Sequence, residues 1–269
     1  MCDLRSCLDN VTDEDVKLKR KQISNFFIIT GDSPTDPIAK KPSEEQLDWS
    51  ARIAAAQEKT VRTFNLDTLA YYYHGADDND YERIQGGFIV GHSLLTAAGI
   101  PCAGEADIRT ALAMKISDIV NKGGSFAEFG AIDYKLGTII MGHDGLFHIK
   151  IADGKPVLRA MGVYHGKRST GVSVEANIVA GDITTLWVTQ THNGKLKIIV
   201  TEGKAIKAPK LMIGNTQTQI DFGMHPDDYM DRLFAEAPAH HCAISVGHNS
   251  ELFKKVVAIL DIECVVIKP

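Results

Sequence analysis

Long apolar runs are missing from this 269-residue sequence. The stretch Ile259–Ile267 is interrupted by Asp261 and Glu263 and is far too short to cross a bilayer. The first ten residues contain no apolar core either, so they do not resemble a secretory signal peptide. The sequence therefore predicts neither a membrane span nor a secretory leader.

An excess of charge and a regular cysteine framework are also lacking. Charged residues make up 23% of the chain and the net charge is −5, which gives no indication of binding to nucleic acid or to a membrane surface. The five cysteines are odd in number and scattered, which favours free thiols and a cytoplasmic location. No G-x-G-x-x-G or H-E-x-x-H motif occurs.

Helical and extended patterns alternate in the first 124 residues, which is typical of a parallel α/β sheet. Capping boxes at 12–15 and 43–46 predict two helix starts. The expected helices cover about 12–22, 43–62, 85–98 and 108–120, and the expected strands cover 67–74 and 101–104. The segment 24–30 fits a short strand or a buried helix end, and Gly123 with Gly124 is expected to end the last helix.

Short β-rich runs with glycine turns replace the helical periodicity after Gly124. Six strands are expected over 136–141, 146–151, 156–160, 170–176, 182–191 and 195–203, followed by helices 225–235 and 249–260 and strands 239–247 and 262–267. The expected fold class is a partial parallel α/β domain over residues 1–124. An antiparallel β-barrel-like domain with C-terminal helices follows over residues 125–269.

Three groups able to bind a metal or move a proton occur at the predicted boundaries between elements: Glu105, Glu128 and His143. Glu105 lies between a strand end and a helix start, where α/β sheets usually bind ligands, and Asp107 can cap the helix. Two carboxylates and a neutral imidazole are ligands suited to Mn²⁺ or Mg²⁺, whereas a structural zinc site is usually rich in thiolates. The alternative is a surface glutamate, a glutamate near a helix cap and a loop histidine.

Among the remaining candidates, His240 and His241 stand at the start of an apolar strand near the end of the chain. Because neighbouring strand residues point to opposite faces, we expect at most one of them in a given site. The alternative is one buried structural histidine and one exposed histidine. His74, at a predicted strand end, is a second candidate, and Lys167 either binds a substrate oxygen or belongs to a solvated turn.

Four runs in this order resemble the L-arabinose/L-fucose isomerase family: G-I-P-C-A-G-E-A-D-I-R-T-A-L-A-M, S-F-A-E-F, I-M-G-H-D-G and P-A-H-H-C-A. The resemblance extends over about residues 12–267. It implies an α/β domain packed on a β-rich C-terminal domain, and Mn²⁺, or another divalent cation such as Mg²⁺ or Co²⁺, bound by Glu105, Glu128, His143 and His241. His240 is the reserve for the last ligand, and His74, His240 and Lys167 are candidate substrate contacts.

The resemblance also implies an aldose–ketose isomerase that acts on a small sugar through a cis-enediol. Glu105 and Glu128 would act as acid and base, and the sequence does not assign which is which. Members of the family usually begin with a further α/β domain, so the alternative is a truncated, non-catalytic sugar-binding or assembly module. A metal-assisted retro-aldol cleavage is a third possibility. The expected assembly is a homo-oligomer, trimer or hexamer, or an association with a missing N-terminal segment.

Overall fold

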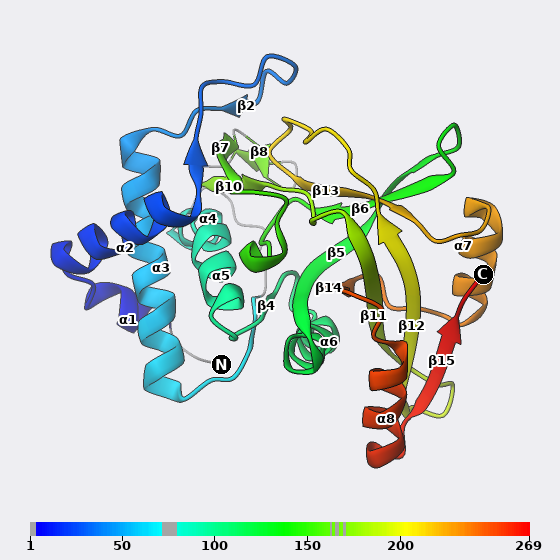
Figure 1. Ribbon diagram of the computed structural model, residues 1–269. Helices are drawn as coiled ribbons and strands as arrows, with labels where there is room; N and C mark the ends of the chain where they lie inside the picture. Colours follow the sequence, from blue (N-terminus) through cyan, green and yellow to red (C-terminus); the bar gives the residue numbers. More distant parts are fainter. Residues whose placement is uncertain (1–3, 72–79, 162, 165–166, 169–170) are drawn as a thin grey trace.

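The structure, a computed structural model, describes residues 4–71, 80–161, 163–164, 167–168 and 171–269 (Figure 1). Its first part is helical. The helices are α1 (Leu4–Asp9), α2 (Asp13–Phe26), α3 (Glu44–Phe64), α4 (Asp80–Gly86), α5 (Phe88–Ala97) and α6 (Ile108–Val120). Thr12 and Ser43 form the predicted capping boxes at the starts of α2 and α3. Helix α4 begins at Asp80, before the helix expected over 85–98, and α5 covers most of that expected range.

The parallel pairing expected before α6 is present as a short ladder. Strand β3 (Leu69–Ala70) pairs in parallel with β4 (Cys102–Ala103). The second half of the predicted strand 67–74 lies outside the described residues. Asp107 caps α6 as expected, through a hydrogen bond from the backbone N–H of Thr110 at 2.9 Å.

Six antiparallel strands close into a barrel, which confirms the barrel-like expectation. Around the ring they are β11 (Gly181–Gln190), β14 (Cys242–Val246), β5 (Lys122–Asp133), β6 (Thr138–His143), β13 (Thr216–Asp221) and β12 (Leu196–Ala205), which pairs again with β11. Strand β15 (Glu263–Ile267) joins β12 in parallel outside the ring. Helices α7 (Pro226–Ala235) and α8 (Ser250–Leu260) match the predicted ranges within one residue.

Alternating side chains along the barrel strands enter two different cores. On β11, Ile183 and Trp187 pack in one cluster, whereas Leu186 and Val188 pack in another that also contains Met114 of α6 and Phe253 of α8. This period of two is what a strand buried on both faces requires. Helices α6 and α8 therefore cover the second face of the barrel wall, and α6 is held firmly beside the strands that carry the candidate site (Figure 1).

A second sheet joins distant parts of the chain. Its centre, β7 (Val157–Met161), pairs with β10 (Val172–Glu175), with β1 (Ile28–Ile29) in parallel and with β2 (Ala39–Lys40). A separate short ladder joins β8 (Val163–Tyr164) to β9 (Lys167–Arg168). The N-terminal segment 28–40 thus completes a sheet with strands from beyond the predicted boundary at residue 124.

Two local predictions were wrong. The run 146–151 is not a strand, because it holds a 3₁₀ turn over Ile149–Ile151, and its successive residues Leu146 and Phe147 are both buried. Gly123 and Gly124 do not end α6, which ends at Val120, but belong to β5. Gly124 has φ +103°, and a Cβ there would lie 2.4 Å from the carbonyl oxygen of Met114. Close approach of β5 to α6 therefore requires glycine at this position.

Among the described residues, every helix is too short or too polar to cross a membrane.

Candidate metal centre

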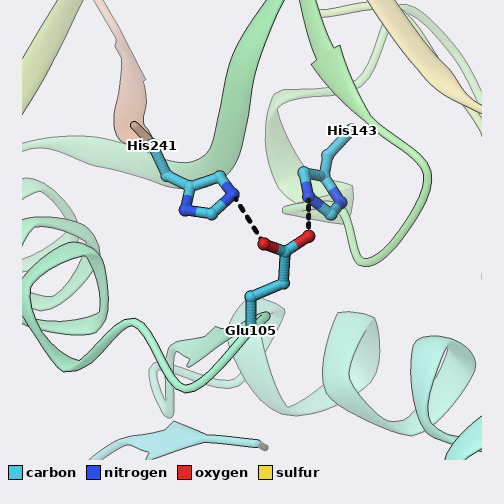
Figure 2. A group of neighbouring side chains, drawn as sticks. All are labelled: Glu105, His143 and His241. Atoms are coloured by element: carbon cyan, nitrogen blue, oxygen red, sulfur yellow. Dashed lines mark ion pairs between the residues drawn. The ribbon is translucent and has the colours of Figure 1, made fainter. Parts of the chain in front are cut away.

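Glu105, His143 and His241 lie close together at the ends of three different strands (Figure 2). Glu105 follows β4, His143 is the last residue of β6, and His241 precedes β14. The Nε2 atom of His143 lies 3.5 Å from Glu105 Oε1, and the Nε2 atom of His241 lies 3.6 Å from Glu105 Oε2. Figure 2 shows the carboxylate between the two imidazole rings, so one group from the helical part faces two from the barrel.

A strained turn orients Glu105. Glu105 and Ala106 have φ of +53° and +55°, which is uncommon for residues with a side chain. The turn is held by a 2.6 Å hydrogen bond from the Ala106 N–H to the Tyr71 carbonyl and by a 3.0 Å bond from the Asp107 N–H to the Gly104 carbonyl. These bonds fix the backbone from which the Glu105 side chain reaches the two histidines.

Glu128 and His240 form the other side of the cluster. The Nε2 atom of His240 lies 2.7 Å from Glu128 Oε2, and Glu128 Oε1 lies 4.0 Å from His143 Nε2. One ligand atom each from Glu128, His240 and His241 lies within 4.8 Å of the others. The structure therefore brings together all four residues expected as ligands and also the reserve, His240.

Two expectations about these residues require correction. Glu128 does not lie in a turn, because it pairs with Gly142 inside the β5–β6 ladder. His240 and His241 do not point to separate sites, because both precede β14 and the alternation of a regular strand does not apply to them.

Asp107 determines how His241 presents its ring. The Nδ1 atom of His241 lies 3.0 Å from Asp107 Oδ2, while the other carboxylate oxygen caps α6. Burial disfavours the charged form of the Asp107 carboxylate and would raise its pKa. The hydrogen bonds from His241 and Thr110 outweigh this effect and lower the pKa of Asp107 to about 2. An ionised Asp107 can only accept a hydrogen bond, so Nδ1–H of His241 donates to it, and the lone pair of His241 is at Nε2 and faces Glu105.

His143 is buried in a field of negative charge. Burial disfavours its imidazolium form, but the Asp144, Glu105 and Glu128 carboxylates outweigh this and raise the pKa of His143 to about 9. The ring packs edge-on against Phe126, with 4.7 Å between centroids, and Phe126 also contacts His241 at 4.4 Å. The same carboxylates that favour a proton on this ring would favour a cation beside it.

The donor set fits a divalent cation. The Nε2 atoms of His143 and His241 are buried and make no hydrogen bond to any residue that the structure describes, although both face carboxylate oxygens. Buried imidazole nitrogens are normally hydrogen-bonded or bound to a metal. Two carboxylates with two imidazoles, and no thiolate, suit Mn²⁺ or a similar ion.

An open concavity of about 400 Å³ adjoins the cluster. Its walls are formed by Glu105, Ala106, Asp107, Ile108, Arg109, His240 and His241. A volume of this size accommodates a small organic molecule. Glu105 keeps 36% of its side-chain surface exposed and Glu128 keeps 31%, so both carboxylates remain accessible to a ligand.

Two candidates are not placed by the structure. His74 lies outside the described residues. Lys167 belongs to β9, where its backbone pairs with Tyr164, and its side chain lies outside the described part of the chain. The sequence pattern, in turn, did not identify the contacts that Asp107 and Asp144 make with the site histidines. Asp144 directly follows His143 in the chain, and Asp107 follows Glu105 by two residues, so adjacency to the predicted ligands was the available signal.

Comparison with known proteins gives a match over part of the chain. Residues 152–268 match the model of a protein family described as L-fucose isomerase, C-terminal domain. No curated protein matches the chain. The matched range contains His240 and His241, whereas Glu105, Glu128 and His143 precede it.

Proposed function

We propose that the chain is a metal-dependent aldose–ketose isomerase of the L-arabinose/L-fucose isomerase family, because residues 152–268 match the model of the L-fucose isomerase C-terminal domain. One observation carries the proposal: Glu105, Glu128, His143 and His241 belong to two overlapping groups of possible ligands that share His241, although they are spread over 137 positions of the chain (105 to 241). Only His241 lies in the matched range. The convergence of the other three therefore supports the proposal independently of the family match.

Glu105, Glu128, His143 and His241 would hold the cation, which we take to be Mn²⁺ as the family resemblance implies. When bound, such an ion polarises substrate oxygens and acidifies the proton on the adjacent carbon. His241 reaches this position because Asp107 holds its Nδ1 side. Phe126 packs against both histidine rings, which keeps them in place.

Glu105 and Glu128 would transfer the protons. Interconversion of an aldose and a ketose moves one proton between neighbouring carbons and a second between their oxygens, so it needs one group that accepts and one that donates. Both carboxylates are about one-third exposed, and Glu105 lines the concavity. His240, 70% exposed and 2.7 Å from Glu128, is positioned to exchange a proton between this carboxylate and solvent.

The test is turnover of a panel of aldoses by the full chain with Mn²⁺, with the ketose product measured directly. The proposal expects turnover by the wild type and by Glu45→Gln, which changes an exposed carboxylate on α3, and a loss of at least about 100-fold in Glu105→Gln and Glu128→Gln. No turnover of any aldose by folded, metal-loaded protein would contradict it. Sugar binding that Glu128→Gln leaves unchanged would favour the non-catalytic module instead.

We also predict that the protein forms a homo-oligomer and is located in the cytoplasm. Sedimentation of the full chain at several concentrations tests the assembly, which we expect to be larger than a monomer.

A further inference from the structure

His143 is held in place at the very end of a strand. It is the last residue of β6, and the chain leaves the sheet at the following residue, Asp144. The end of a strand is less restrained than its interior and opens more readily. A contact at this position therefore decides how firmly the imidazole of His143 faces Glu105 and Glu128.

Thr216 provides such a contact from the neighbouring strand. It is the first residue of β13 and the partner of His143 in the β6–β13 ladder. The backbone N–H of His143 donates a hydrogen bond to Thr216 Oγ1 at 2.9 Å, and the same hydroxyl donates to the carbonyl oxygen of His143 at 3.1 Å. Both residues are buried, so water does not readily replace these two bonds.

The neighbourhood of Thr216 is built for this close approach. A Cβ at Gly142 would lie 1.7 Å from the carbonyl oxygen of Thr216, so only glycine beside His143 allows β13 to lie so near. On its other side, Thr216 forms a parallel bridge with Ala176, whose carbonyl accepts a 3.0 Å hydrogen bond from the Gln217 N–H. Thr216 is therefore fixed from two sides and can hold His143.

We propose that Thr216 is a positioning residue of the candidate metal centre. Its hydroxyl fixes the backbone of His143, so that Nε2 of the ring faces Glu105 and Glu128. The inference rests on the metal centre of the isomerase function proposed above. A displacement of a ligand by as little as about 0.5 Å disturbs such a group of side chains, which gives a backbone contact at His143 a measurable effect on metal binding.

The other contacts of His143 restrain a different part of the residue. Phe126 packs edge-on against the ring, and Asp144 Oδ1 lies 3.1 Å from Nδ1. These contacts determine the rotation of the imidazole. Thr216 determines the point from which the side chain extends, so the ring contacts do not compensate for its loss.

A matched pair of substitutions separates this role from a general contribution to stability. Thr216→Val removes the hydroxyl and keeps the branched shape of the side chain. Thr218→Val is the control, because Thr218 is also buried, lies on the same face of β13 and accepts a 2.9 Å hydrogen bond from the Ile178 N–H, away from His143. Thr216→Ser keeps the hydroxyl, and Thr216→Ala is a second variant without it in case the valine variant does not fold.

Calorimetric titration of Mn²⁺ into the full chain and these variants provides the first test. We expect Thr216→Val to weaken Mn²⁺ binding by about 10- to 100-fold, because residues that support metal ligands typically have effects of this size. Thr216→Ser should retain most of the affinity and Thr218→Val all of it. Thermal melting should show a lower melting temperature, by a few degrees, in both valine variants, since each loses a buried hydrogen bond.

Nuclear magnetic resonance of the imidazole nitrogens in the metal-free chain provides the second test. The ring signals of His143 should shift in Thr216→Val and stay unchanged in Thr218→Val. Unchanged His143 signals in Thr216→Val would overturn the inference, whether or not the chain binds Mn²⁺. Equal Mn²⁺ affinity of the two valine variants would also overturn it and leave the metal centre standing, whereas absence of Mn²⁺ binding by folded wild-type protein would reject the metal centre itself.

Discussion

At the scale of single residues, Asp107 combines two roles that can be separated. One carboxylate oxygen caps α6 and the other contacts Nδ1 of His241. Asparagine is as good a helix cap as aspartate, but it is a weaker acceptor for an imidazole N–H and does not hold one tautomer as firmly. Substitution by asparagine therefore affects the histidine and leaves the helix largely intact.

We predict that Asp107→Asn weakens Mn²⁺ binding by about 10- to 100-fold and changes the melting temperature of the metal-free chain by only a few degrees. Asp107→Ala should show the same loss of binding and also lose about 1 kcal/mol of stability with the cap. Calorimetry and thermal melting measure both effects. Undiminished Mn²⁺ binding by Asp107→Asn would show that Asp107 serves only as a cap.

Glu202 on β12 gives a prediction about pH. Its Oε1 accepts a hydrogen bond from the Ser250 N–H at the start of α8, and its Oε2 lies 3.1 Å from Lys268 Nζ. Burial opposes its charge, but the contacts with Ser250 and Lys268 outweigh this and lower the pKa of Glu202 below its ordinary 4.5. A lowered pKa in the folded state stabilises the protein above the unfolded value, and this contribution is lost as pH falls through the folded pKa.

Glu202→Gln should therefore reduce the free energy of unfolding by about 1 kcal/mol at pH 7, and its difference from the wild type should shrink as pH falls below about 4.5. Urea unfolding of both proteins between pH 3 and pH 7 measures this. A difference that stays constant over the whole range would mean that the charge of Glu202 contributes nothing.

At the scale of elements, the contact between α6 and β5 positions the site. Asp107 caps the start of α6 at the concavity, and β5 carries Glu128. The two elements approach so closely at Gly124 that a Cβ would lie 2.4 Å from the Met114 carbonyl oxygen, and φ is +103°. Any side chain at this position forces the helix away from the strand.

Gly124→Ala should destabilise the chain by roughly 2–4 kcal/mol through backbone strain and overpacking together. Gly137→Ala is the matched control, because Gly137 also has a positive φ, +66°, but no atom lies within 4 Å of the added Cβ, so its cost should be about 1 kcal/mol. Chemical unfolding compares the two. Equal destabilisation would contradict the importance of the close α6–β5 contact.

The predictable elements were those with strong local signals. The capping boxes and the Asp107 cap are decided by neighbouring residues, and the corresponding helices appeared. The run 146–151 was mistaken for a strand because periodicity does not separate a short apolar strand from another buried segment. The positions of Gly123 and Gly124 within β5 depend on tertiary contact with α6, which no local pattern reveals.

At the scale of the whole molecule, the pairing of strands that are distant in the chain could not be predicted from the sequence. Strands β1 and β2 join β7 across more than one hundred residues (Ile28 pairs with Val157), and nothing in either segment specifies the other. The candidate site was more predictable, because chemistry and family resemblance together selected Glu105, Glu128, His143 and His241, which the fold brings together. The contacts of Asp107 and Asp144 with the site emerged only from the three-dimensional arrangement.

A calorimetric titration of Mn²⁺ into the full chain, into Glu105→Gln and Glu128→Gln, and into Glu45→Gln tests the central claim most directly. We expect one site in the wild type and in Glu45→Gln, with binding lost or weakened at least about 100-fold in the other two variants. Absence of Mn²⁺ binding by folded wild-type protein, or unchanged binding by both site variants, would show that these four side chains do not form the metal centre.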